Sequence, residues 1–114
     1  MVVDNEGVIR FWSDGARHLF GHDSTAALGR TLDVIVPIEF RQRHWNGFHR
    51  AVEAQKSNID GLAAALPVLC ADGCVRQFAG RLSLVRDPTG RVVGAMATYC
   101  EMCANTEGLP ILGA

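Results

Sequence analysis

The chain is organised around residues 36–52, which read VPIEFRQRHWNGFHRAV. Pro37 stands where a proline begins a helix at no cost, because its missing N–H would have no partner in the first turn. At helical spacing from His44 lie apolar or small residues such as Phe48 and Gly47. The pattern predicts one amphipathic helix with a histidine on its inward face and a glycine that leaves space beside the imidazole.

Length and composition set the broad class. The 114 residues suit one domain, and 48% apolar residues, 20% charged residues and a net charge of −1 are typical of a soluble globular protein. The slightly acidic balance argues against a nucleic-acid partner, and no apolar run reaches membrane-spanning length. Four cysteines without a secretory signal predict a reducing, cytoplasmic setting. Met1–Val3 already reads as a strand, which leaves open a helix ahead of Met1.

Turn signals divide the rest of the chain into short elements. Before the long helix, strands at Met1–Val3 and Gly7–Trp12 read as a hairpin. Ser13 or Asp14 then caps a short helix that Gly21 ends. Three longer strands are predicted after the long helix, at Leu62–Cys70, Cys74–Val85 and Arg91–Glu101. The small, apolar residues 104–114 have no period and predict an irregular tail.

The middle long strand alternates between apolar and polar positions. Phe78, Gly80 and Leu82 lie on one side, which predicts a half-buried antiparallel sheet with these residues facing inward. Pairing through the turn at residues 71–73 places Ala64 opposite Gly80.

This order of elements resembles a PAS domain, and the resemblance covers residues 1–103 as a single domain. It implies an α+β fold with a five-stranded antiparallel sheet, helices covering one face and a ligand pocket between them. The Asp-Gly turn between the long strands and the run Arg86–Gly94 are typical of that family. PAS pockets hold different cofactors or none, so the fold alone does not give the function.

The long helix is similar to the haem helix of the FixL oxygen sensors, because Val36 and Pro37 are followed by His44 in the run Arg41–His44. The resemblance implies haem b, with His44 as the proximal ligand of the iron and the bound gas or substrate on the distal side. The positions implied to contact haem are His44, Phe48, Arg50, Ile59, Ala64, Gly80 and Leu82. Arg50 falls where an arginine meets a haem propionate.

Ala64 departs from the oxygen sensors, since it stands where they carry an arginine that hydrogen-bonds bound oxygen. With Gly80 opposite, two small residues predict a distal side that is roomier than a diatomic gas requires. In size, architecture and the Arg-His-Trp region the chain is also similar to the N-nitroglycine lyases. That likeness implies ferrous haem splitting a small nitramine into nitrite, glyoxylate and ammonia, with Arg76 or Arg81 at the rim holding the substrate carboxylate.

Three functional readings therefore stay open: the haem-dependent lyase, a haem-based sensor of O₂, CO or NO, and a cofactor-free PAS dimerisation module. The family resemblance also implies a homo-oligomer that forms through PAS surfaces. The catalytic residues are not identified by the sequence.

The cysteines carry a separate hypothesis. Cys70 and Cys74 flank one turn, and Cys100 and Cys103 end the last strand. If the two arginines that flank the last turn pair with each other, Cys74 lies opposite Cys103 and four sulfurs converge, as tetrahedral zinc requires. A zinc site, a disulfide and free thiols all stay open.

Overall fold

The computed structural model describes residues 1–102 and Leu109. The elements are β1 (Val2–Asp4), β2 (Ile9–Phe11), α1 (Asp14–Phe20), α2 (Ser24–Ala27), the 3₁₀ turns η1 (Leu32–Val34) and η2 (Ile38–Phe40), α3 (Arg41–Ala54), β3 (Ala63–Leu69), β4 (Val75–Arg86) and β5 (Val92–Glu101). None of the described helices is long and apolar enough to cross a membrane. The irregular tail predicted at residues 104–114 lies outside the described residues, except for Leu109.

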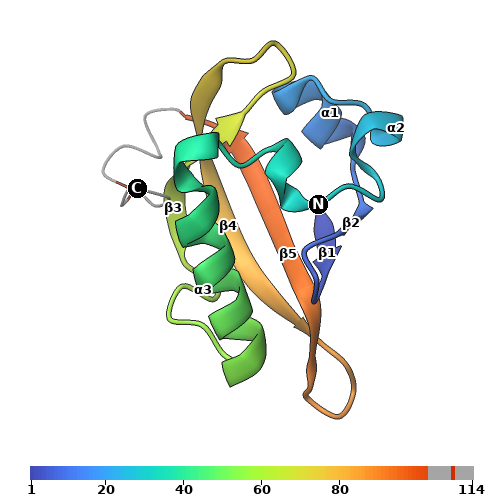
Figure 1. Ribbon diagram of the computed structural model, residues 1–114, viewed down its shortest axis with the longest axis vertical. Helices are drawn as coiled ribbons and strands as arrows, with labels where there is room; N and C mark the ends of the chain where they lie inside the picture. The colour runs from blue at the N-terminus through green and yellow to red at the C-terminus, as the bar shows by residue number, and fades with distance from the viewer. Residues whose placement is uncertain (103–108, 110–114) are drawn as a thin grey trace.

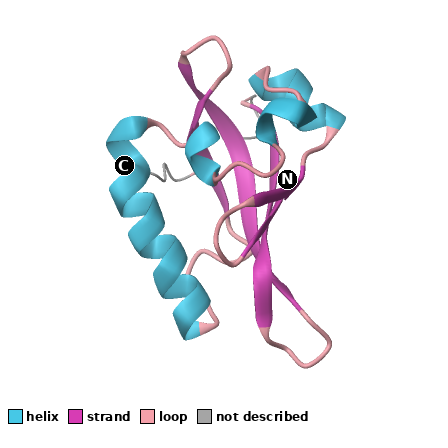
Figure 2. Ribbon diagram, turned by 45° about the vertical axis from the view of Figure 1, so that its right-hand side comes forward, coloured by secondary structure: helices cyan, strands magenta, loops and turns pink. Residues whose placement is uncertain are grey.

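The strands form one antiparallel sheet in the order β2-β1-β5-β4-β3, so the last strand of the chain lies at the centre. All the helices lie on one face of this sheet, with α3 alongside β3 and β4 and with α1 and α2 at the other end (Figure 1 and Figure 2). The predicted α+β fold, with its five-stranded antiparallel sheet and helices on one face, is confirmed.

Local signals place the first helix where the sequence predicts it. The Ser13 side chain accepts a hydrogen bond of 3.1 Å from the backbone N–H of Ala16, and Gly21 ends the helix in the left-handed conformation at φ 85°. Phe20 then packs edge-on against Phe78 and Tyr99, with ring centroids 5.0 and 4.9 Å apart. The main hydrophobic core therefore lies between α1 and the central strands.

The long helix begins later than predicted. Residues 38–40 form a 3₁₀ turn, and regular α-helix starts only at Arg41. Pro37 has extended backbone at ψ 146°, and the Arg41 guanidinium donates hydrogen bonds to the carbonyls of Val36 and Asp33 at 3.1 and 3.0 Å. These bonds hold the chain in a turn ahead of the helix, so the predicted single helix over the whole stretch is wrong for its first residues.

The register of the long strands confirms one predicted pair and corrects another. Ala64 pairs with Gly80, as the turn predicts. In the last hairpin, however, Arg86 pairs with Val92 rather than Arg91, and the register shifts next to Arg86. The reason is that Asp87 and Arg91 close the loop, with a hydrogen bond of 2.9 Å from the Asp87 N–H to the Arg91 carbonyl.

Candidate functional site

Helix α3 presents one half-buried face, and all its remaining residues are exposed. The half-buried residues recur at helical spacing and are Arg41, His44, Trp45, Phe48, Ala51 and Val52, followed by Gln55. None of the residues of α3 is fully buried. The structure therefore places His44 on the inward face of a helix that the core covers only in part.

The His44 imidazole lies among aromatic rings. Its ring stacks on Phe48 with centroids 6.1 Å apart at 29°, and it meets the edge of Trp45 at 4.9 Å and 76°. Burial lowers the pKa of His44, and the Asp33 carboxylate offsets only part of this effect. The Nδ1 atom of His44 is buried and has no hydrogen-bond partner among the described residues. Burial therefore disfavours the charged imidazole, and its buried Nδ1 is left without a partner.

Trp45 anchors the first half of α3 to the opening hairpin. Its Nε1–H donates a hydrogen bond of 2.7 Å to Oδ1 of Asp33, and its ring lies so close over Gly7 that a Cβ at Gly7 would overlap it. The ring also stacks on the exposed His49, with centroids 5.7 Å apart at 30°. Sequence reasoning missed this anchoring role of Trp45.

The far end of α3 is tied to the last hairpin. Gln55 adopts the left-handed conformation at φ 61°, and its side-chain oxygen accepts a hydrogen bond of 2.8 Å from the Val92 N–H. The Gln55 carbonyl accepts a second hydrogen bond, of 2.8 Å, from the Arg86 guanidinium. The helix is therefore held at both ends, on either side of His44 and Phe48.

The wall of the sheet beside α3 carries the predicted small residues. Ala64 and Gly80 are paired and buried, and Leu82 is half-buried on the same face. A Cβ at Gly80 would lie 2.5 Å from Cδ1 of Leu66 and 3.2 Å from Cδ1 of Tyr99. These two neighbours fill the space that the small residues leave, because protein interiors pack at high density. The roomy distal side predicted from Ala64 and Gly80 is therefore not present.

Leu66 and Tyr99 are the site residues that sequence reasoning missed. Leu66 lies two residues after Ala64 on the same face of β3, and Tyr99 is the residue of β5 that pairs with Gly80. Burial raises the pKa of the Tyr99 hydroxyl to about 12. The alternation of β5 would have pointed to Tyr99, whereas its contact with Gly80 depends on the register between two strands.

Three of the other predicted positions are more exposed than a pocket requires. Arg50 is exposed on α3, and Ile59 is 37% exposed in the loop between α3 and β3. Gly47 is also exposed, and a Cβ there would meet no atom within 4 Å. The prediction that Gly47 makes room beside the imidazole is wrong, because its side of the helix faces away from the sheet.

The two arginines predicted for the pocket rim are engaged elsewhere. Both terminal nitrogens of Arg76 bond to the Asp72 carboxylate, at 3.0 and 2.7 Å. Arg81 is exposed and donates to the Gly61 carbonyl. Alternation along β4 turns Arg81 away from the inner face, and Arg76, which is in step with Phe78, is held by Asp72 at the start of the strand. Neither is placed to hold a substrate carboxylate beside α3.

The cysteines of the described chain do not converge. Cys70 is buried on the inner face, in step with Val68, whereas Cys100 is exposed and faces the opposite side of the sheet from Tyr99. Cys70, Cys74 and Cys100 are free thiols, and no group of three metal-ligating side chains is found among residues 1–102 and 109. Three of the four sulfurs of the predicted zinc site therefore do not converge, and the fourth, that of Cys103, lies outside the described chain.

Among the described residues, two hollows lie beside α1, and α3 lines neither of them. The larger, about 610 Å³, lies between α1 and the end of β5. The smaller, about 320 Å³, lies between the end of α1 and the turn from β3 to β4. Directly over Gly80, the inner face of the sheet is occupied by Leu66 and Tyr99.

Comparison with known proteins gives the family and the fold. A family model described as the PAS fold matches residues 1–103. The chain is 30% identical over 76 residues to an uncharacterized protein of Azorhizobium caulinodans, a match that covers 66% of this chain and 10% of the relative. The chain therefore spans about a tenth of the length of that relative.

Among solved structures, the chain is similar to the PAS domain of a protein from Colwellia psychrerythraea, with a TM-score of 0.73, 20% identity and coverage of 89% of this chain and 82% of that one. The PAS domain of the histidine kinase ThkA gives a TM-score of 0.54, 20% identity and coverage of 90% and 95%. The LOV domain of the blue-light photoreceptor Aureochrome1 gives a TM-score of 0.61 and 17% identity, with coverage of 91% of this chain and 75% of that one. At these identities the likeness shows the fold alone.

Proposed function

Because this chain belongs to the PAS family, whose pattern it matches over residues 1–103, we propose that it is a haem-binding sensor module in which His44 is the axial ligand of the iron. The proposal rests on the His44 side chain. Burial keeps the imidazole neutral, and its Nδ1 has no partner among the described residues. A neutral imidazole is the form that binds iron, so the donor chemistry fits haem.

The side chains around His44 are apolar, as the faces of a haem macrocycle require. Phe48 stacks beside the imidazole, and the facing wall of Ala64, Gly80 and Leu82 has only apolar side chains or none. Arg50 is exposed on the same helix and would pair with a haem carboxylate. When bound, haem supplies an iron with an open coordination position for a small ligand.

For haem to bind between α3 and the sheet, the side chains over Gly80 would have to move. Leu66 is 9% exposed, and its Cδ1 is the end of a flexible side chain, whereas the Tyr99 ring is held by the Phe20 ring at 4.9 Å. A change of rotamer at Leu66 would therefore open the wall over Gly80 at the lowest cost. We expect Leu66→Ala to bind haem more tightly than the wild-type chain in a titration followed at the Soret band.

A nitramine lyase is the second candidate function. It is favoured by the side chains of Ala64, Gly80 and Leu82, which offer no hydrogen bond to an oxygen molecule on the iron. Against it, Leu66 and Tyr99 crowd Gly80, which leaves less room for a substrate of several heavy atoms than for a diatomic gas. The arrangement therefore supports the sensor better than the lyase.

The decisive experiment is reconstitution of the purified full chain with haemin, followed by its absorption spectrum. The wild-type protein should show a Soret band that His44→Ala loses, while the matched control His49→Ala keeps it, because His49 is exposed on the same helix. Circular dichroism checks that both variants fold. A wild-type chain without a spectral shift would leave the cofactor-free PAS module as the function.

The two haem functions then separate on the reduced protein. A sensor should change its visible spectrum with CO or NO and release no nitrite from N-nitroglycine. Catalytic release of nitrite that His44→Ala abolishes would instead establish the lyase.

A further inference from the structure

Two cysteines face each other across the turn that joins β3 to β4. The backbone N–H of Cys70 donates a hydrogen bond of 2.9 Å to the carbonyl of Cys74, and the next rung of the ladder pairs Leu69 with Val75. Cys70 and Cys74 are therefore directly opposite each other. The Cα atoms of such a hydrogen-bonded antiparallel pair lie about 5.5 Å apart. Disulfides span Cα separations of about 4.4–6.8 Å, so this backbone suits one.

The turn fixes the two residues in this arrangement. Gly73 adopts the left-handed conformation at φ 85°, and its N–H donates a hydrogen bond of 3.0 Å to the carbonyl of Cys70. The Asp72 carboxylate accepts a hydrogen bond of 3.0 Å from the N–H of Cys74. The N–H of Ala71 bonds to a carbonyl at the end of α1, at 2.8 Å. The backbone positions of both cysteines are thus set by bonds within the turn and to the neighbouring helix.

Both cysteine side chains point to the same side of the hairpin. Cys70 is in step with the buried Val68, and directly opposite residues of an antiparallel pair share a face. The pKa of Arg76 is raised above its ordinary value, chiefly by the Asp72 carboxylate and further by the side chains of Cys70 and Cys74. One guanidinium therefore lies near both sulfurs.

The two thiols differ in their access to solvent. Cys70 is 5% exposed, and its thiol donates a long hydrogen bond of 3.8 Å to the carbonyl of Val68. Cys74 is exposed. A hollow of about 320 Å³ between the end of α1 and the turn is lined by Cys70 and Arg76, among others. A reagent from solvent therefore meets Cys74 first, while Cys70 has room to rotate toward its neighbour.

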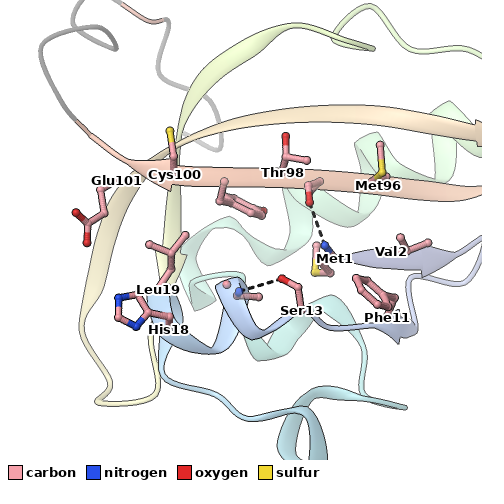
Figure 3. A pocket seen from close by; sticks show the side chains of 14 residues that line it. Met1, Val2, Phe11, Ser13, His18, Leu19, Met96, Thr98, Cys100 and Glu101 are labelled. Atoms are coloured by element: carbon pink, nitrogen blue, oxygen red, sulfur yellow. Dashed lines mark hydrogen bonds between the residues drawn. The ribbon is translucent and has the colours of Figure 1, made fainter.

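Cys100 takes no part in this pair. It lies opposite Ala79, on the outer face of the sheet. Figure 3 shows the Cys100 side chain directed away from α1, on the other side of β5 from Leu19. Within residues 1–102, Cys70 and Cys74 are thus the cysteines that share a side of the sheet.

We propose that Cys70 and Cys74 are a redox modification site, at which oxidised glutathione closes a reversible disulfide across the turn. The Cys74 thiolate attacks one sulfur of oxidised glutathione, forms a mixed disulfide and releases one glutathione thiolate. The Cys70 thiolate then attacks the Cys74 sulfur and releases the second glutathione thiolate. The protein gives up two electrons and two protons, and oxidised glutathione takes up both to become two molecules of reduced glutathione.

The exposure of Cys74 makes the bond reversible. Exposed disulfides have more oxidising potentials than buried structural ones, and a thiol from solvent can attack them directly. Reduced glutathione in excess therefore reaches the Cys74 sulfur and reopens the bond by the same steps in reverse. The site does not involve His44, so it is independent of haem.

The test uses the full chain with Cys100→Ser and Cys103→Ser, which leaves one pair of thiols. Millimolar oxidised glutathione is added, the reaction is stopped with acid, and the intact mass is measured. The product should carry no glutathione and should be about 2 Da lighter than the reduced chain. Adding Cys70→Ser should stop the reaction at the mixed disulfide on Cys74. Adding Cys74→Ser instead should slow the reaction at least about tenfold, because Cys70 is buried.

A matched control moves one thiol by a single position. Cys74→Ser combined with Val75→Cys places the second thiol opposite Leu69, on the other face of the hairpin. Val75 is 46% exposed, so the change leaves the core intact. In the folded chain this variant should keep the mixed disulfide, whereas in urea both chains should close, since a short flexible loop brings either pair together. Circular dichroism checks that each variant folds.

Several outcomes would overturn the proposal. They are closure of the shifted variant as fast as the native pair, a mixed disulfide that persists on the native pair, and a bond that excess reduced glutathione does not reopen. In the wild-type chain, peptide mapping should find Cys70 joined to Cys74, and a bridge from either of them to Cys103 would refute the assignment.

Discussion

Replacing Gly80 with alanine tests how the space facing α3 is filled. The new Cβ would lie 2.5 Å from Cδ1 of Leu66 and 3.2 Å from Cδ1 of Tyr99. Apolar carbon atoms rest about 3.5–4.0 Å apart, so roughly 1 Å of overlap with Leu66 must be relieved. The backbone of Gly80 is not in the left-handed region, so steric overlap is the main cost.

The magnitude follows from two opposing effects. Overpacking a core costs about 1–3 kcal/mol, whereas replacing a glycine by alanine within a strand gains about 0.5–1 kcal/mol of conformational entropy. We expect Gly80→Ala to lower the free energy of unfolding by about 1–2 kcal/mol. The midpoint of thermal unfolding should fall by about 5–10 °C.

Urea unfolding followed by the fluorescence of Trp12 and Trp45 measures this change, with equal m-values confirming a comparable transition. The matched control is Gly47→Ala, because Gly47 lies inside α3 with no atom within 4 Å of a Cβ. Without overlap, that substitution should stabilise the chain by about 1 kcal/mol.

The double variant identifies the partner. Leu66→Ala alone should cost about 2–4 kcal/mol through the cavity it leaves. In that background Gly80→Ala should no longer be destabilising, which gives a coupling energy of about 2 kcal/mol. Additive costs, or a stabilising Gly80→Ala in the wild-type background, would refute the reasoning that Leu66 occupies the space over Gly80.

Three further predictions concern single contacts. Trp45→Phe removes the hydrogen bond of 2.7 Å to Asp33 and should lower the free energy of unfolding, measured in urea, by about 1 kcal/mol. Asp33→Asn keeps the acceptor oxygen, so its free energy of unfolding should stay near that of the wild type. Equal losses in the two variants would assign the effect to another contact. Burial lowers the pKa of His44 below 6.5, so the native state binds fewer protons than the unfolded chain and stability should fall as the pH drops below 6.5. His44→Phe should lose this part of the pH dependence in urea unfolding series, and an unchanged pH dependence would contradict the assignment. Ser13→Ala removes the cap on Ala16 and should cost about 1 kcal/mol in thermal unfolding, which Ser13→Asp should restore.

The elements that could be predicted are those whose signals are local. Ser13 and Gly21 bound α1 because a cap depends on residues within one turn. The pairing of Ala64 with Gly80 also follows from local chemistry, since a three-residue turn at 71–73 sets the register of both strands.

The errors lie where a distant contact decides the outcome. The first residues of the predicted long helix form a 3₁₀ turn, which Arg41 holds by bonding back to the carbonyls of Val36 and Asp33. The zinc hypothesis depended on Arg86 pairing with Arg91, whereas Arg86 pairs with Val92 and Val85 with Gly94, so the register along both strands is two residues away from the predicted one. Such a shift changes which side chains lie opposite each other.

The sequence by itself determined the order of elements, the antiparallel sheet and the inward position of His44, because caps, turns and periodicity act over a few neighbouring residues. Only the tertiary structure decided what fills the space over Gly80, since Leu66 and Tyr99 reach it from two other strands. Such contacts join residues far apart in the chain, so no local pattern encodes them.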